Sequence, residues 1–137
     1  MITQKPIISL IGSDITIVAS GHASLLAREA AEKLETKSIS VEVLDVRVLN
    51  PFHAEEIVDS VKKTRNLLVI DSGCKSGGFS AEIIAKVVEQ LPVDCLRNPP
   101  VRIALPDAPA PTSRLLEKDY YLSVEDLVKA AEKVLNK

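Results

Sequence analysis

The stretch DSGCKSGGFSAEI, residues 71–83, gathers within one short segment the residue types of this sequence that could do chemistry. Its glycines follow an apolar run and precede a helical pattern, which is the setting of loops that bind phosphate groups. Cys74 could also serve as a nucleophilic thiolate, because Lys75 and a helix start both stabilise a negative charge on sulfur. The third interpretation is a tight turn that joins a strand to a helix.

The phosphate interpretation fails in its strict form. A Walker loop needs a glycine directly before the Lys-Ser pair and another glycine five residues earlier, and Cys74 and Val69 occupy these positions. A looser anion site stays open, because the backbone amides of Gly77, Gly78 and Phe79 would point outward at a helix N-terminus, which carries partial positive charge. We favour the turn, whose glycines permit positive φ and close strand-to-helix packing, and keep these three residues as a candidate anion site.

A thiolate nucleophile would need a base, and the sequence has two histidines, His22 and His53. His22 follows the first long predicted strand, so it could approach Cys74 where neighbouring strands end. The alternative is a loop thiol and a histidine that merely opens a helix. The histidines, Cys74 and Cys95 show none of the short spacings typical of metal ligands. We therefore predict that this chain by itself holds no catalytic, cofactor-binding or metal-binding residue.

Composition narrows the class of protein. The chain has 137 residues of which 46% are hydrophobic, which predicts one domain spanning 1–137 with a single sizeable core. Aromatic residues are 3% and the formal charge is −2, so we expect no binding of nucleic acid. The sequence holds no apolar run of membrane-spanning length, and its first residues do not resemble a signal peptide. We expect a cytoplasmic protein with reduced cysteines that does not bind membranes.

The elements that must position the glycine-rich segment alternate between strand and helix. Extended apolar runs predict strands at 6–10, 15–20, 39–46, 67–70 and 101–105. Helical spacing of apolar residues predicts helices at 22–37, through 54–61, at 79–91 and from an N-cap at Ser123 to 135. The proline-rich run PDAPAPTS is expected to be extended. This rhythm predicts a mostly parallel sheet covered by helices on both faces, with the loop at 71–78 at a carboxyl end of a strand, where such folds bind ligands.

Five short motifs follow one another along the chain. They are GSDITIVASG at 12–21, a D-x-R-x-x-x-P turn at Asp45, Arg47 and Pro51, the Gly77-Gly78-Phe79 step, Arg102 with an Asp-x-Pro-x-Pro run at Asp107, Pro109 and Pro111, and SVEDLVKAAEKVL at 123–135. Together they span nearly the whole chain. In this order they resemble the C-terminal domain of transketolase-like thiamine diphosphate enzymes, most closely that of the β subunit of 2-oxo acid dehydrogenases such as pyruvate or branched-chain 2-oxo acid dehydrogenase.

The resemblance implies a three-layer α/β/α domain with a five-stranded mixed sheet whose first strand is antiparallel to the others. It implies part of an enzyme that oxidatively decarboxylates a 2-oxo acid and transfers the acyl group to lipoamide. The intact enzyme uses thiamine diphosphate and Mg²⁺, which lie between two other domains. Because this sequence has no Gly-Asp-Gly plus Asn diphosphate motif, we expect the chain to bind no cofactor and to be inactive alone, in the cytoplasm or, in a eukaryote, the mitochondrial matrix.

The partners implied by the resemblance are an α subunit, a second β subunit and the small basic subunit-binding domain of the acyltransferase. The docking region would comprise Arg97 and Asn98, before the last predicted strand, and Lys137. Arg97 stands where the family often has an acidic residue, so like charges would weaken docking of a basic partner. We also expect the isolated domain to expose apolar surface and to form a homodimer.

Two alternatives stay open. One is the equivalent domain of a transketolase or a deoxyxylulose-phosphate synthase. The other is a stand-alone module that binds an anion at Gly77-Gly78.

Overall fold

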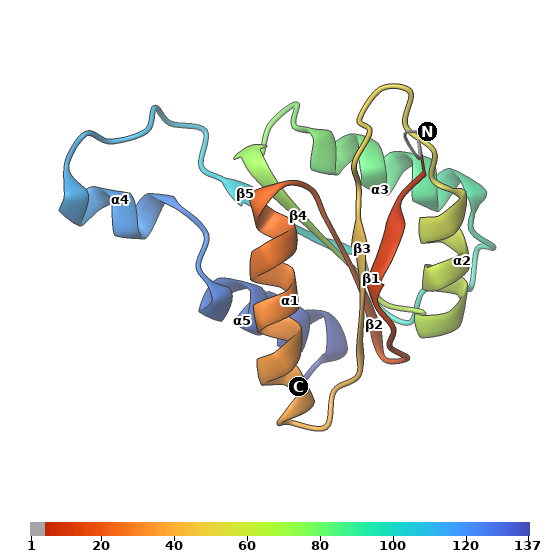
Figure 1. Cartoon of the computed structure of the whole chain (residues 1–137). Helices are drawn as coiled ribbons and strands as arrows, with labels where there is room; N and C mark the ends of the chain where they lie inside the picture. The colour runs from red at the N-terminus through yellow and green to blue at the C-terminus, as the bar shows by residue number, and fades with distance from the viewer. Residues whose placement is uncertain (1–4) are drawn as a thin grey trace.

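A computed structural model describes residues 5–137, which form one five-stranded sheet with helices on both faces (Figure 1). The elements in chain order are β1 (Ile7–Leu10), β2 (Ile15–Ala19), α1 (His22–Glu35), β3 (Val41–Asp45), α2 (Glu55–Thr64), β4 (Leu67–Cys74), α3 (Phe79–Gln90), β5 (Val101–Leu105), α4 (Arg114–Tyr120) and α5 (Val124–Leu135).

The sheet has the order β1-β3-β2-β4-β5. β1 pairs with β3 in the antiparallel sense, and the β3, β2, β4 and β5 pairings are all parallel. Every residue of β2 is buried, as expected for a central strand covered on both faces. The predicted fold class, including the antiparallel first strand, is confirmed.

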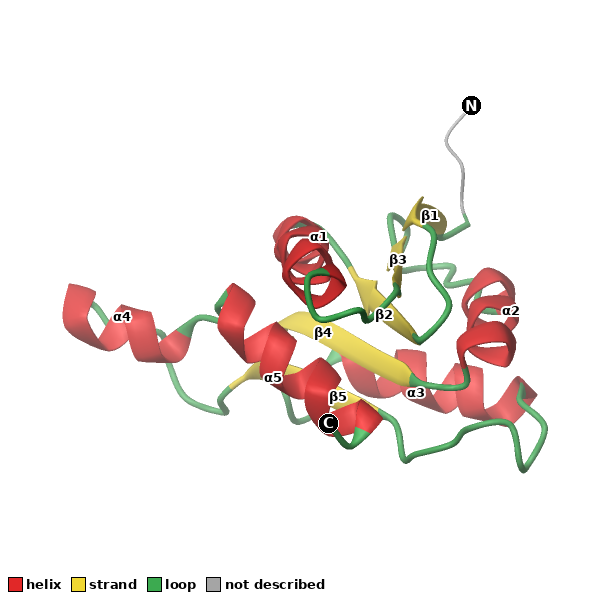
Figure 2. Cartoon of the chain, turned by 90° about the horizontal axis from the view of Figure 1, so that it is seen from below, coloured by secondary structure: helices red, strands yellow, loops and turns green. Residues whose placement is uncertain are grey.

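Two apolar clusters fill the space between the sheet and its helices. On one face, α1 and α5 pack their alanine, leucine and valine side chains against Ile15 and Ile17 of β2. On the other face, α2 and α3 pack against Val18 of β2 and Val69 of β4. Adjacent strand residues therefore serve opposite layers, which is the period of two expected of a strand. Figure 2 shows the same layers from below.

Helix α5 begins as the sequence predicts. The Ser123 side chain accepts a hydrogen bond from the Asp126 N–H at 3.2 Å, and the Asp126 carboxylate accepts one from the Ser123 N–H at 2.8 Å, which is a capping box. Two ion pairs, Lys33 with Glu125 and Lys37 with Glu132, then join α5 to α1. Beside these ion pairs, the apolar stripes that the sequence periodicity indicates for α1 and α5 pack in the same core cluster.

Three predictions about elements were wrong in detail. β4 does not end at Ile70 but continues to Cys74, which pairs with Leu105 after an irregularity in register. The joint to α3 is therefore residues 75–78 rather than 71–78. The helical spacing of apolar residues over 79–91 places Val88 among the inward positions, but Val88 is 45% exposed because the buried stripe of α3 is narrower. The third difference is α4, which no sequence pattern indicated.

Candidate functional site

The joint between β4 and α3 depends on its glycines. Gly77 has a φ of 65°, in the left-handed region that favours glycine. Gly78 has an ordinary φ of −78°, but a Cβ on it would lie 2.2 Å from the carbonyl oxygen of Cys74. One glycine is thus needed for its conformation and the other for the close approach of helix to strand. Both glycines thus have the roles expected of the turn that we favoured.

The N-terminus of α3 already has an anionic partner within the chain. One oxygen of the Asp71 carboxylate accepts a hydrogen bond from the Ser80 N–H at 2.8 Å, and the other accepts one from the Gly73 N–H at 2.8 Å. A carboxylate at a helix N-terminus is stabilised by the helix dipole. An external anion at Gly77, Gly78 and Phe79 would face the negative charge of Asp71. The candidate anion site stays a prediction, and Asp71 weighs against it.

Two of the family-like motifs meet at this joint. The Asp107 carboxylate, from the Asp-x-Pro-x-Pro run, accepts hydrogen bonds from the Ser76 N–H at 3.0 Å and from the Ser76 hydroxyl. These two bonds, with smaller contributions from the charges of Arg102 and Lys75, hold the pKa of Asp107 below its ordinary value. The Arg102 guanidinium donates to the backbone carbonyl of Lys75. The joint is therefore fastened to the segment that leads toward α4.

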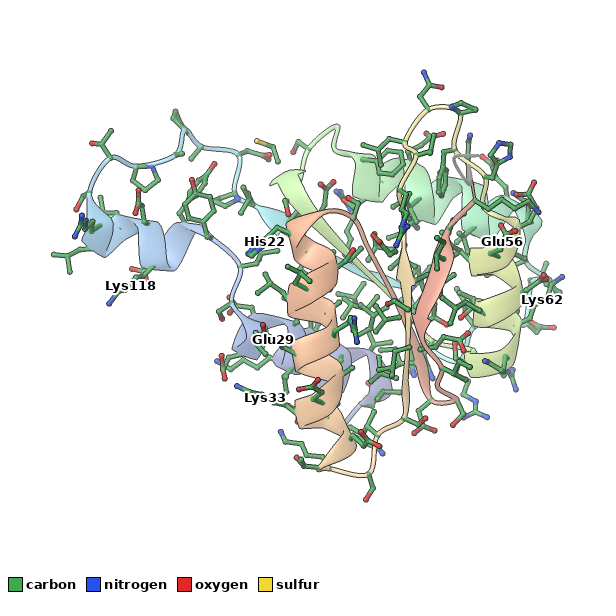
Figure 3. All side chains as sticks on the ribbon, in the orientation of Figure 1. His22, Glu29, Lys33, Glu56, Lys62 and Lys118 are labelled. Carbon is green, nitrogen blue, oxygen red and sulfur yellow. The ribbon has the colours of Figure 1, made fainter. Side chains whose placement is uncertain are left out.

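The thiol and histidine considered as a nucleophile and base are not brought together. Cys74 is exposed at the end of β4, and no hydrogen bond joins it to His22 within residues 5–137. His22 instead lies at the start of α1 (Figure 3) and lines a cleft.

Across the same described residues, no group of three or more His, Cys, Asp or Glu side chains could hold a metal ion. None of the helices described there is long and apolar enough to cross a membrane.

The cleft lies at the carboxyl ends of the strands and has a volume of about 270 Å³. Most of its wall is apolar, and its lining residues are His22, Ala23, Leu26, Ser72, Leu105, Tyr121 and Leu122. The sequence predicts a candidate anion site at this edge of the sheet, but on Gly77, Gly78 and Phe79 rather than in this cleft. The residues that form the cleft come from α1, β4, β5 and the link before α5, so no local motif marks them.

The segment from Pro106 to Leu122 extends beyond the sheet and carries α4 away from the other helices in both views (Figures 1 and 2). We call it the arm. No residue of α4 is buried, and Leu115 and Leu116 are 79% and 58% exposed. At the base of the arm, the Tyr120 hydroxyl donates a hydrogen bond to the carbonyl of Ala108 at 2.9 Å. This bond joins the segment that leaves the sheet to the segment that returns to it.

The candidate docking residues do come together. The Asn136 side-chain amide donates to Asn98 Oδ1 at 2.7 Å, and the Asn98 amide donates to Asn66 Oδ1 at 3.2 Å. Lys137 follows Asn136, and Arg97 is exposed beside Asn98. The hydrogen bond between Asn136 and Asn98 thus brings the C-terminal end of the chain next to the segment before β5 that holds Arg97 and Asn98, whereas the arm follows the other end of β5. Its function as a docking region stays a prediction.

The three-layer fold, the strand order and the meeting of the Gly-Gly-Phe and Asp-x-Pro-x-Pro motifs together define the class of domain. Residues 6–127 match the family model of the transketolase C-terminal domain, and the chain belongs to that family. Within the family it is similar to subunits of one enzyme. The mitochondrial pyruvate dehydrogenase E1 component subunit beta of Caenorhabditis elegans is 37% identical over 125 residues, which are 91% of this chain and 36% of that protein.

Other similarities agree with this. The corresponding subunit of Saccharomyces cerevisiae is 36% identical over 126 residues, which are 91% of this chain and 34% of that protein. A solved split-gene transketolase, described as an inactive beta4 tetramer, superposes with a TM-score of 0.83 at 28% identity over 97% of this chain and 43% of that one. The chain thus spans about a third of the length of the pyruvate dehydrogenase subunits that it matches.

Mg²⁺ that is bound together with a diphosphate takes oxygen ligands from one or two carboxylates and from the phosphates. Residues 5–137 hold no group of three or more His, Cys, Asp or Glu side chains that could bind a metal ion, and the absence of a cofactor from this chain stays a prediction. The N-terminus of α3, next to the glycine-rich joint, is taken by the Asp71 carboxylate.

Proposed function

We propose that this chain acts as the C-terminal assembly and partner-docking domain of the β subunit of a thiamine diphosphate-dependent 2-oxo acid dehydrogenase. The observation that carries the proposal is the similarity to pyruvate dehydrogenase β subunits over 91% of the chain. The geometry supports it, because the described residues include two exposed regions that a partner could contact, the arm and the docking region. They do not bring the candidate nucleophile and base together. The complete enzyme would decarboxylate a 2-oxo acid oxidatively and pass the acyl group to lipoamide, and the 2-oxo acid would be selected outside this chain.

In this proposal the partners are an α subunit and a second β subunit, and thiamine diphosphate is bound by other domains of the assembly. The relatives are named as mitochondrial proteins. A location in the mitochondrial matrix, if the source cell is a eukaryote, or in the cytoplasm otherwise, stays part of the proposal.

The docking region at Arg97, Asn98 and Lys137 supports a partner beside the segment before β5. Arg97 and Lys137 make no side-chain hydrogen bond or ion pair within residues 5–137, so their positive charges are free to act on a partner. A basic acyltransferase domain would be repelled there. We therefore expect docking of that domain to be weak in this chain unless Arg97 is changed.

Co-purification with an α subunit tests the assembly function. The tagged chain and the α subunit of a pyruvate dehydrogenase would be expressed together, and a stable complex after size-exclusion chromatography is the expected result.

Isothermal titration with thiamine diphosphate and Mg²⁺ tests the absence of a cofactor site. Clear binding by this chain alone would contradict the proposed function.

A second candidate function is the same domain in a transketolase, favoured by the similarity to the split-gene transketolase at a TM-score of 0.83. Expression with transketolase catalytic chains, in parallel with the dehydrogenase α subunit, separates the two because each complex would form with one set of partners only. The anion-binding module is tested by titration with inorganic phosphate, and Asp71 predicts no binding.

A further inference from the structure

Three exposed cationic side chains from separate parts of the chain gather at the docking region. Arg65 is the C-cap of α2, Arg97 lies in the link of residues 91–100 that precedes β5, and Lys137 follows α5. The Arg97 N–H donates a hydrogen bond to the Arg65 carbonyl at 2.9 Å, so the two arginines are neighbours. The hydrogen bond from Asn136 to Asn98 brings the C-terminal end of the chain to the same link (Figure 2). The positive charge is thus collected by tertiary contacts and not by a run of basic residues.

The link that carries these charges is held in place by the rest of the domain. The Arg65 guanidinium donates to the backbone carbonyls of Cys95 at 2.9 Å and Asp94 at 3.0 Å. The Asn98 side-chain amide donates to Asn66 Oδ1 at 3.2 Å, and Asn66 is itself 2% exposed. A surface that is ordered before its partner arrives loses less conformational entropy on binding. The docking region is therefore better suited to binding than a flexible basic loop would be.

No carboxylate neutralises the three cations within residues 5–137, where none of them forms an ion pair. Asp94 lies in the same link but pairs with neither arginine among those residues. The Asp14 carboxylate, on the preceding end of β2, accepts a hydrogen bond from the Ser40 N–H at 2.7 Å instead. The three positive charges are therefore available to a group outside the described chain.

Carboxylates are the anions that fit this surface. A planar guanidinium donates two parallel N–H bonds to one carboxylate, and a lysine ammonium adds a point charge. We propose that the docking region, with Arg65 beside it, binds an acidic segment of a partner protein through carboxylates placed at Arg97 and Lys137. Nucleic acid fits less well, because the chain as a whole has a formal charge of −2. The inference rests on the proposed docking function and reverses the charge of the partner, from a basic domain to an acidic segment.

An NMR titration of the isotope-labelled 137-residue chain tests the inference, because NMR detects weak binding and locates it. The probes are hexaglutamate and hexalysine peptides with blocked ends. We expect hexaglutamate to bind and to shift the amide signals of residues 95–98 and 137, and hexalysine to leave them unchanged. The double variant Arg97→Asp/Lys137→Glu should weaken hexaglutamate binding at least about tenfold, because two attractive contacts at exposed positions become repulsive.

The matched control is the double variant Arg28→Asp/Lys129→Glu. It makes the same change of net charge at exposed positions of α1 and α5 that form no ion pair among the described residues, so it should leave hexaglutamate binding unchanged. Equal weakening by the two double variants would overturn the inference, since the effect would belong to the net charge. Preferential binding of hexalysine, or equally tight binding of a short DNA duplex at the same signals, would overturn it too.

Failure of this inference can be told apart from failure of the proposed function. A chain that binds no hexaglutamate but still co-purifies with the α subunit would overturn the acidic partner and leave the assembly function standing. A chain that binds hexaglutamate at residues 95–98 and does not co-purify with the α subunit would support the acidic site and contradict the assembly function.

Discussion

Lys63 of α2 forms an ion pair with Glu42 of β3, whose side chain is only 1% exposed. The same carboxylate accepts hydrogen bonds from the Ser60 hydroxyl and, at 3.3 Å, from the Gly12 N–H. Ser60 is in turn 2.7 Å from the Thr16 hydroxyl of the central strand β2. A charged residue in the middle of the sheet is thus held by a chain of partners that links two strands and a helix.

Removing the lysine should destabilise the fold. We expect Lys63→Met to lower the free energy of unfolding by about 1 to 3 kcal/mol, because a buried carboxylate loses the only cationic partner it has among residues 5–137. Lys62→Met is the control on the next residue of α2. Lys62 is exposed and pairs only with Asp59 at 3.9 Å, so its loss should cost less than about 0.5 kcal/mol. Urea unfolding measures both, and equal effects would contradict the assigned role of Glu42.

The same site predicts a pH dependence. Burial alone would raise the pKa of Glu42, but the hydrogen bonds from Lys63, Ser60 and Gly12 together outweigh it and hold the pKa below its ordinary value. A carboxyl group with a lowered pKa stabilises the fold above its unfolded pKa, near about 4.3, and this contribution is lost as the pH falls through the folded pKa. Between pH 6 and about pH 3, Glu42→Gln should therefore lose less stability than the unmodified chain does. Urea unfolding across that range tests it, and parallel curves would refute it.

Glu42 also shows where the sequence was insufficient. Most acidic residues of this sequence fall on predicted helices, where a polar, solvated face is the ordinary interpretation. Glu42 interrupts a β-branched run, and nothing local shows that Lys63 and Ser60, which lie on the next helix, will reach it. The cleft is a similar case, since its walls are assembled only when α1, β4 and the link before α5 come together.

The parts that were predicted correctly have short-range causes. The periodic apolar residues of α1 and α5, the N-cap at Ser123 and the parallel direction of the later strands all follow from local patterns and from the rules of crossover connections. α4 escaped prediction because it follows a proline-rich run and has no buried stripe. A helix without an inward face leaves no hydrophobic period to detect.

The two glycines of the joint should respond differently to substitution. Gly78→Ala would place a Cβ 2.2 Å from the Cys74 carbonyl oxygen, so we expect it to cost at least about 2 to 3 kcal/mol of stability through displaced backbone. Gly77→Ala meets nothing within 4 Å and pays only for its φ of 65°, about 1 kcal/mol. Thermal and urea unfolding of the pair measure the difference. The reverse order would show that conformation rather than close approach controls this joint.

The charge at residue 97 should decide how the docking region treats a basic partner. We expect Arg97→Asp to bind the basic subunit-binding domain of a pyruvate dehydrogenase acyltransferase roughly threefold to tenfold more tightly than the unmodified chain, because repulsion becomes attraction at an exposed position. Arg28→Asp, an equal change of charge at an exposed position on α1, is the control for net charge alone. Isothermal titration at low and high salt provides the measurement, and the gain should shrink as salt screens it. If both variants gained equally, the effect would belong to the overall charge of the molecule and the docking surface would have to lie elsewhere.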